Sequence, residues 1–248
     1  MFIDIHSHLD ICEDISAKIK NAKKENVKII TCGISSPSNR KTLEIKKENP
    51  EVEICLGIYP TDALKMSEKE LTSEIKFIKE NKDKINGVGE VGLDLKENDE
   101  KTLQQQKENL TKFVKLAKEI DKPIIIHSRK AEEECINLLE SIGYNKIVMH
   151  CFSGNFKLVK RILENNWMMS IPTSVKSSQH FQKVIEIAEI KNLLCETDSP
   201  FLHPDKQFPN EPKNVIESYK KIAEIKNISL KEVEKKIEEN YRKLFKGN

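Results

Sequence analysis

The amino-acid sequence predicts a (β/α)₈ TIM barrel with one additional C-terminal helix. Three observations favour this fold. Eight short apolar runs alternate with amphipathic segments rich in lysine and glutamate. Strands that alternate with helices pair in parallel, and eight such units fit a chain of 248 residues. The competing doubly wound sheet is disfavoured because no Gly-x-Gly-x-x-Gly motif follows the first run.

The eight apolar runs define the strand candidates in chain order. Each is followed by a segment predicted to form a helix, or a loop and a helix. The candidates are residues 2–8, 27–34, 52–58, 85–93, 123–129, 146–152, 167–173 and 193–198.

The helical segments show the expected 3.6-residue period. Between the fourth and fifth strand candidates, apolar residues at 103, 110, 113, 114, 116 and 117 form one stripe, and Pro123 ends the segment. Beyond residue 214 the chain contains one helix more than eight units need, with Ser229 as a suitable N-cap. Since no Gly/Ser-rich or Pro-rich linker interrupts the chain, residues 1–248 are expected to form a single domain.

Composition limits the possible functions. The 42 basic and 40 acidic residues leave a net charge of +2, which argues against a broad basic surface for nucleic acid. No apolar run approaches the roughly 18 residues of a membrane span, and no signal peptide is recognised. The six cysteines form no Cys-x-x-Cys pair, so neither disulfides nor a structural zinc site are expected. A cytoplasmic protein without membrane contact or an obligate protein partner follows.

Polar side chains gather near the C-terminal ends of the strand candidates, where (β/α)₈ enzymes build their active sites. Imidazoles and carboxylates together are typical ligands of a divalent transition-metal ion. Each of these residues alone has an ordinary structural explanation, but six at one rim favour a metal site. The six are His6, His8, Glu90, His127, His150 and Asp198.

The first strand candidate, FIDIHSH, alternates apolar and polar side chains. Ile3 and Ile5 are expected to face the surrounding helices, while Asp4, His6 and His8 face the barrel axis. Asp4 lies deeper than the two histidines. We therefore expect it to orient a ligand histidine rather than to bind metal.

Six sequence blocks, in order, resemble the TatD-type metal-dependent deoxyribonucleases, which belong to the amidohydrolase-like metal barrels. The resemblance covers nearly the whole chain. The blocks are FIDIHSHLD, GEVGLD, KPIIIHSR, MHCFSG, LLCETDSPFL and NEP.

The resemblance implies two divalent metal ions. One ion would be held by His6, His8, Glu90 and Asp198, and Glu90 would bridge to a second ion held by His127 and His150. Mg²⁺, Mn²⁺ and Zn²⁺ are the candidates. Four imidazoles suit Mn²⁺ or Zn²⁺ better than Mg²⁺, which prefers oxygen ligands.

The resemblance also implies roles around the metals. Asp198 would orient the attacking water or accept its proton. Glu196 is a candidate catalytic residue, with a buried structural carboxylate as the alternative. Arg129 is a candidate phosphate clamp, with a salt bridge at the rim as the alternative. His180 and His203 are expected in exposed loops, and His203 is a candidate substrate contact.

Three positions depart from the family pattern. Tyr59 stands where the family usually has a histidine, Leu95 and Lys96 stand where it tends to have aromatic residues, and Phe208-Pro209 replaces a basic residue before NEP. All three alter the substrate pocket, including Tyr59 as a candidate substrate contact, and leave the metal ligands intact.

The sequence therefore predicts a metal-dependent hydrolase that cleaves phosphodiester bonds, with DNA as the favoured substrate and exonuclease action as one mode. An amidohydrolase or esterase acting on a small molecule or an aminoacyl-RNA ester is the alternative, motivated by Tyr59 and the lost basic residue. A binding module that keeps metal only for stability is the third hypothesis.

Overall fold

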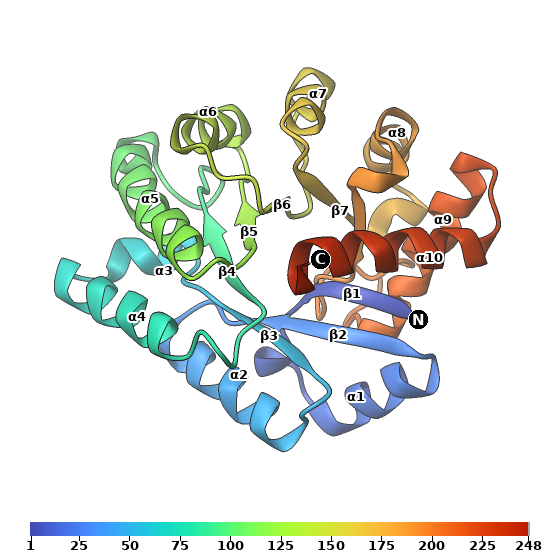
Figure 1. Ribbon diagram of the computed structural model, residues 1–248, viewed down its shortest axis with the longest axis horizontal. Helices are drawn as coiled ribbons and strands as arrows, with labels where there is room; N and C mark the ends of the chain where they lie inside the picture. Colours follow the sequence, from blue (N-terminus) through green and yellow to red (C-terminus); the bar gives the residue numbers. More distant parts are fainter. Residues whose placement is uncertain (248) are drawn as a thin grey trace.

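The computed structural model describes residues 1–247 as eight parallel strands surrounded by helices (Figure 1). The strands neighbour one another in chain order, from β1 to β8. Each lies within one of the eight predicted ranges, so the (β/α)₈ prediction is confirmed. Their bounds are β1 Phe2–Ser7, β2 Val27–Cys32, β3 Glu53–Leu56, β4 Gly87–Gly92, β5 Ile124–His127, β6 Ile147–Met149, β7 Met168–Pro172 and β8 Leu193–Glu196.

Helices follow every strand and form the outer layer (Figure 1). The long helix after β4 carries the predicted apolar stripe, which is buried from Leu110 to Ala117. The helices are α1 Ile15–Lys24, α2 Ser36–Glu48, α3 Pro60–Lys65, α4 Glu68–Glu80, α5 Leu103–Glu119, α6 Glu132–Ile142, α7 Phe156–Glu164, α8 Gln179–Ile187, α9 Ile216–Lys226 and α10 Leu230–Tyr241.

The barrel closes between β8 and β1 at the C-terminal ends of these strands. The Asp198 amide donates to the carbonyl of His6 at 2.9 Å, and the His8 amide donates to the carbonyl of Ser199 at 2.7 Å. A parallel bridge pairs Ser7 with Ser199. These bonds bring the polar end of the first strand directly beside the polar end of the last.

Helix α10 is the predicted additional helix, and it covers the N-terminal end of the barrel, where strands begin. The Tyr241 hydroxyl donates to Glu53 at the start of β3, at 2.6 Å. The Asn240 side chain donates to the carbonyl of Leu193 at the start of β8, at 2.8 Å. Ser229 caps the helix by accepting from the Glu232 amide, as predicted. In Figure 1 the helix crosses in front of the strands.

The sequence also predicted that the cysteines form no disulfides and that no segment spans a membrane. All six cysteines have free thiols. Within residues 1–247, no helix combines the length and the apolar character needed to cross a membrane.

Glu53 offers a test of the contact between α10 and the barrel. Burial alone would raise the pKa of Glu53, but hydrogen bonds from Lys246 and Tyr241, together with the nearby Lys28, lower it below its usual 4.5. A lowered folded-state pKa stabilises the protein above the unfolded-state value, and this contribution is lost as the pH falls. We expect Glu53→Gln to lower the free energy of unfolding by about 1–3 kcal/mol at pH 7.

Urea unfolding at pH 7 and at pH 4 or below would measure this effect. The difference between wild type and Glu53→Gln should shrink as the pH drops below 4.5, and the exposed Glu51→Gln should differ little from wild type at either pH. A difference that grows on acidification would contradict the assignment.

Candidate metal centre

Four candidate ligand atoms, two from the end of β1, one from β4 and one from the β8–β1 seam, converge at the C-terminal end of the barrel. The Nε2 atoms of His6 and His8 lie 3.1 Å apart. Each also lies 3.4–3.5 Å from Glu90 Oε2 and 3.3–3.5 Å from Asp198 Oδ1. Four ligands at tetrahedral Zn–N and Zn–O distances would be separated by about 3.3 Å. The donor types and their spacing therefore fit one divalent ion.

The other oxygen of Glu90 faces a second group of donors. Glu90 Oε1 lies 2.9 Å from His127 Nδ1 and 3.6 Å from His150 Nε2. The rings of His6 and His150 stack with centroids 3.9 Å apart. Glu90 thus stands between two groups of imidazoles, as a bridging carboxylate would. All six predicted ligands come together in one place.

Outer partners orient the imidazoles. His8 Nδ1 lies 3.0 Å from the carbonyl of Cys32, so Nδ1 carries the proton. The lone pair of Nε2 is then available to a metal ion. His150 Nδ1 lies 2.8 Å from Glu196 Oε2 in the same manner. Glu196 also accepts from the Ser170 hydroxyl and the Cys151 amide. Buried behind His150 with both oxygens occupied, Glu196 is placed to position that ring rather than to touch substrate.

Asp94 is a member of the site that the sequence prediction missed. Its Oδ2 lies 2.8 Å from His127 Nε2 and accepts from the Tyr59 hydroxyl at 2.9 Å. The Lys96 amide donates to Oδ1. The quoted block GEVGLD contains this aspartate, four residues after Glu90, but β4 ends at Gly92. Only the path of the following loop brings it back toward His127.

Asp4, predicted to orient a ligand histidine rather than to bind metal, lies outside the candidate ligand groups and does not contact an imidazole ring. Asp4 accepts from the Thr197 amide at 2.8 Å and pairs with the Thr197 hydroxyl at 2.6 Å. Its weaker contact with His6 is to the backbone amide, at 3.4 Å, and His6 Nδ1 has no partner within residues 1–247. Asp4 therefore ties β1 to the end of β8 and lies outside the ligand cluster.

The buried charges of the cluster balance one another. Burial alone would lower the pKa of His6, but hydrogen bonds with Asp198 and Glu90 raise it to about 10. Burial alone would also lower the pKa of His127, but hydrogen bonds with Asp94 and Glu90 raise it to about 9. Conversely, burial alone would raise the pKa of Glu90 and Asp198, and their imidazole neighbours hold both well below the usual range. A divalent ion that binds these imidazoles and carboxylates would therefore displace protons from the imidazoles.

Gly92 allows β4 and β5 to approach closely enough for this arrangement. A Cβ atom at Gly92 would lie 1.9 Å from the carbonyl oxygen of His127, so no other residue fits. The two strands pair there, Gly92 with His127. Gly92 therefore marks a close approach of the β4 and β5 backbones beside Glu90.

A cavity of about 610 Å³ opens above the cluster, and the remaining candidates differ in their relation to it. Tyr59 and Arg129 line the cavity, and the Arg129 guanidinium has no ion-pair partner in the described part of the chain. His203 is not among the lining residues, and its Nδ1 accepts from the Asp205 amide. His180, predicted in an exposed loop, lies in α8 with Nε2 3.1 Å from the carbonyl of Phe152.

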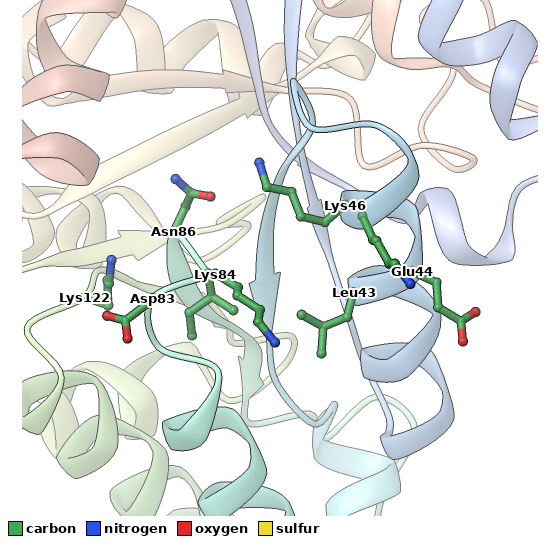
Figure 2. A pocket seen from close by; sticks show the side chains of 9 residues that line it. Leu43, Glu44, Lys46, Asp83, Lys84, Asn86 and Lys122 are labelled. Carbon is green, nitrogen blue, oxygen red and sulfur yellow. The ribbon is translucent and has the colours of Figure 1, made fainter.

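A second cavity, of about 670 Å³, lies at the opposite end of the barrel between α2 and the segments that precede β4 and β5. Lysines such as Lys46, Lys84 and Lys122 line it (Figure 2). Its lining contains no histidine. Active sites of this fold lie at the C-terminal ends of the strands, so the candidate metal centre, and not this cavity, is the candidate active site.

Comparison with known proteins identifies the family. The family model described as TatD related DNase matches residues 3–246. The chain belongs to the TatD-related DNase family. Its members are metal-dependent hydrolases by name, so the protein is an enzyme of this class and the non-enzymatic hypothesis is set aside.

Relatives resemble the chain over its whole length. The uncharacterized metal-dependent hydrolase MJ1582 of Methanocaldococcus jannaschii is 35% identical, over 99% of this chain and 97% of its own. The human deoxyribonuclease TATDN3 is 33% identical, over 98% of this chain and 94% of its own. The crystal structure of YJJV, a TatD homolog from Escherichia coli K12, superposes with a TM-score of 0.91 at 25% identity, covering 99% of this chain and 98% of that chain.

Asp4 provides a test of the seam between β1 and β8. We expect Asp4→Ala to lower the free energy of unfolding by about 2–3 kcal/mol, because the buried Thr197 amide loses its acceptor. Asp4→Asn should stay within about 1 kcal/mol of wild type, since the amide side chain can both accept from the Thr197 amide and donate to its hydroxyl. Chemical denaturation of the three proteins would show whether the two substitutions separate in this order.

Proposed function

We propose that this member of the family is a two-metal phosphodiesterase that acts on DNA. One observation supports this most directly: the two oxygens of Glu90 face separate groups of ligand atoms in a cavity that an unpaired guanidinium also lines. The proposed ligand sets are His6, His8, Asp198 and Glu90 for one ion, and Glu90, His127 and His150 for the other. Two divalent cations held in this way supply a nucleophilic water at neutral pH and stabilise charge on an attacked phosphate.

Asp198 is the proposed proton acceptor. Its side chain is 15% exposed, whereas that of Glu90 is 4% exposed, so a water in the cavity can reach it. Its lowered pKa keeps the carboxyl group ionised at neutral pH. Its Oδ1 faces the two imidazoles of β1, which leaves Oδ2 for the water proton.

The neighbouring residues hold the ligands or contact the substrate. Asp94 keeps the His127 proton on Nε2, so that Nδ1 faces Glu90 as a free donor. Glu196 acts on His150 as a positioning residue. The Tyr59 hydroxyl donates its hydrogen bond to Asp94. Tyr59 therefore contacts a substrate through its ring, since the residue lines the cavity.

DNA is the proposed substrate because Arg129 offers a fork of donors suited to a phosphate, and because the human relative is named a deoxyribonuclease. The four imidazoles favour Mn²⁺ or Zn²⁺ over Mg²⁺ as the resident ions. Nothing in the position of His203 supports a substrate contact.

The decisive experiment is cleavage of 5′- and 3′-labelled single-stranded DNA by protein loaded with Mn²⁺, Zn²⁺ or Mg²⁺, together with metal analysis. We expect two equivalents of metal per chain, products that disappear after EDTA treatment, and a loss of about 10²- to 10⁴-fold in kcat for Asp198→Asn. Glu97→Gln is the matched control, because Glu97 lines the same cavity outside the ligand cluster.

Absence of metal-dependent products at either end label would overturn the proposal. Turnover of amide or carboxylic ester substrates, including aminoacyl-RNA esters, without phosphodiester cleavage would instead assign the amidohydrolase or esterase activity to the same metal centre.

Arg129 gives a separate prediction. Arg129→Ala should raise the KM for DNA about tenfold, because a charge-assisted bond to phosphate is lost, while metal content stays at the wild-type level. Arg129→Lys should recover part of the loss, since lysine keeps the charge but not the planar fork. An unchanged KM in Arg129→Ala, measured at constant salt, would show that Arg129 does not bind a substrate phosphate.

A further inference from the structure

Large apolar side chains are exposed at one end of the barrel. Among residues 1–247 they are Ile11, Phe156, Phe201 and Phe208, which are 47%, 38%, 48% and 73% exposed. Each follows the C-terminal end of a strand, β1, β6 or β8, and so lies on the side of the metal centre. Scattered single apolar residues are ordinary, but a group at the entrance of a cavity indicates a binding surface.

Two of these side chains form a pair beside the active-site cavity. Phe201 lines the cavity, and the ring of Phe208 lies 6.5 Å from it, centroid to centroid, at an interplanar angle of 43°. Phe156 differs, because it stacks on His180 at 5.3 Å and does not line the cavity. The Phe201–Phe208 pair is therefore an exposed aromatic surface at the edge of the cavity.

The loop that carries this pair is anchored at both ends. The Phe201 amide donates to the carbonyl of Asp198 at 2.8 Å, three residues after the proposed proton acceptor. At the other end, the buried Asn210 donates through its amide to Pro200 and through its side chain to the carbonyl of Thr197. These bonds hold both ends of the loop beside Asp198.

We propose that Phe201 and Phe208 form a stacking platform for an unpaired nucleobase next to the scissile phosphate. This inference rests on the proposed function and adds what the protein recognises besides phosphate. Aromatic side chains bind bases through their faces, which are available only where the base is not stacked within a duplex. With a net charge of +2, the protein carries little excess positive charge to attract DNA, and base stacking adds affinity that does not depend on charge.

The first test compares a normal single strand with the same strand carrying an abasic nucleotide beside the cleavage position. Phe201→Ala and Phe208→Ala should each raise the KM for the normal strand at least about fivefold, the low end for one stacked base, with little change in kcat. Neither variant should differ from wild type on the abasic strand. Phe208→Trp should keep the affinity and Phe208→Leu should lose it, because the platform needs an aromatic face. Phe156→Ala is the matched control.

Equal KM values for the alanine variants and wild type would overturn the platform, as would equal losses on the normal and abasic strands. A change in oligomeric state by sedimentation, with DNA affinity unchanged, would assign the patch to a second copy of the chain instead. The variants at Phe156, Phe201 and Phe208 replace exposed side chains, and thermal unfolding would verify that each protein folds, including those with the buried Trp167 replaced.

A second measurement does not depend on cleavage. In a Trp167→Phe background, which removes the only native tryptophan, Phe208→Trp places a single fluorophore on the platform. With EDTA present, the normal oligonucleotide should quench its emission and the abasic one should not. Quenching without any cleavage in metal would sustain the platform and overturn the phosphodiesterase. Cleavage without quenching, at unchanged KM, would overturn the platform alone.

Discussion

The hydrogen bonds between β1 and β8 are the constraint on which the active site depends. Two backbone bonds and the pair formed by Asp4 and Thr197 join the first strand to the last. They fix Asp198 next to His6 and His8, although about three quarters of the chain separates these residues in sequence. Closing so long a loop is entropically costly, and it is the continuous parallel sheet, built strand by strand, that brings the two ends together. The site forms when the barrel does.

Burial of so many ionisable groups is tolerated because they neutralise one another. Isolated, a buried carboxylate or imidazolium would be strongly unfavourable. Here Glu90 contributes one oxygen to each group of imidazoles, and the outer acceptors, the Cys32 carbonyl, Glu196 and Asp94, take the protons that would otherwise occupy the wrong nitrogens. These outer bonds offset the cost of burying the imidazoles. They also leave the opposite ring nitrogens facing the place where the proposed metal ions would bind.

The two ends of the barrel divide the work between stability and chemistry. At the N-terminal end, α10 covers the strands and bonds Glu53 and Leu193, so the core is sealed there. At the C-terminal end the loops leave a cavity open above the candidate ligand cluster and expose the Phe201–Phe208 pair. In the proposal made above, an unpaired nucleobase covers this exposed aromatic pair. Substitutions under α10 are therefore expected to act mainly on unfolding, and substitutions around the cavity mainly on turnover.

The sequence by itself determined the eight strands, the extra helix and the six candidate ligand residues that the structure brings together. These follow from local rules: an apolar run sets a strand, its period of two sets the face, and the strand end sets the rim. Only the tertiary structure decided which outer groups hold the ligands. Asp94 reaches His127 through a loop, Asp4 bonds across the seam to Thr197, and His180 belongs to a helix. Such contacts depend on which segments become neighbours after the barrel closes, and no local pattern encodes that.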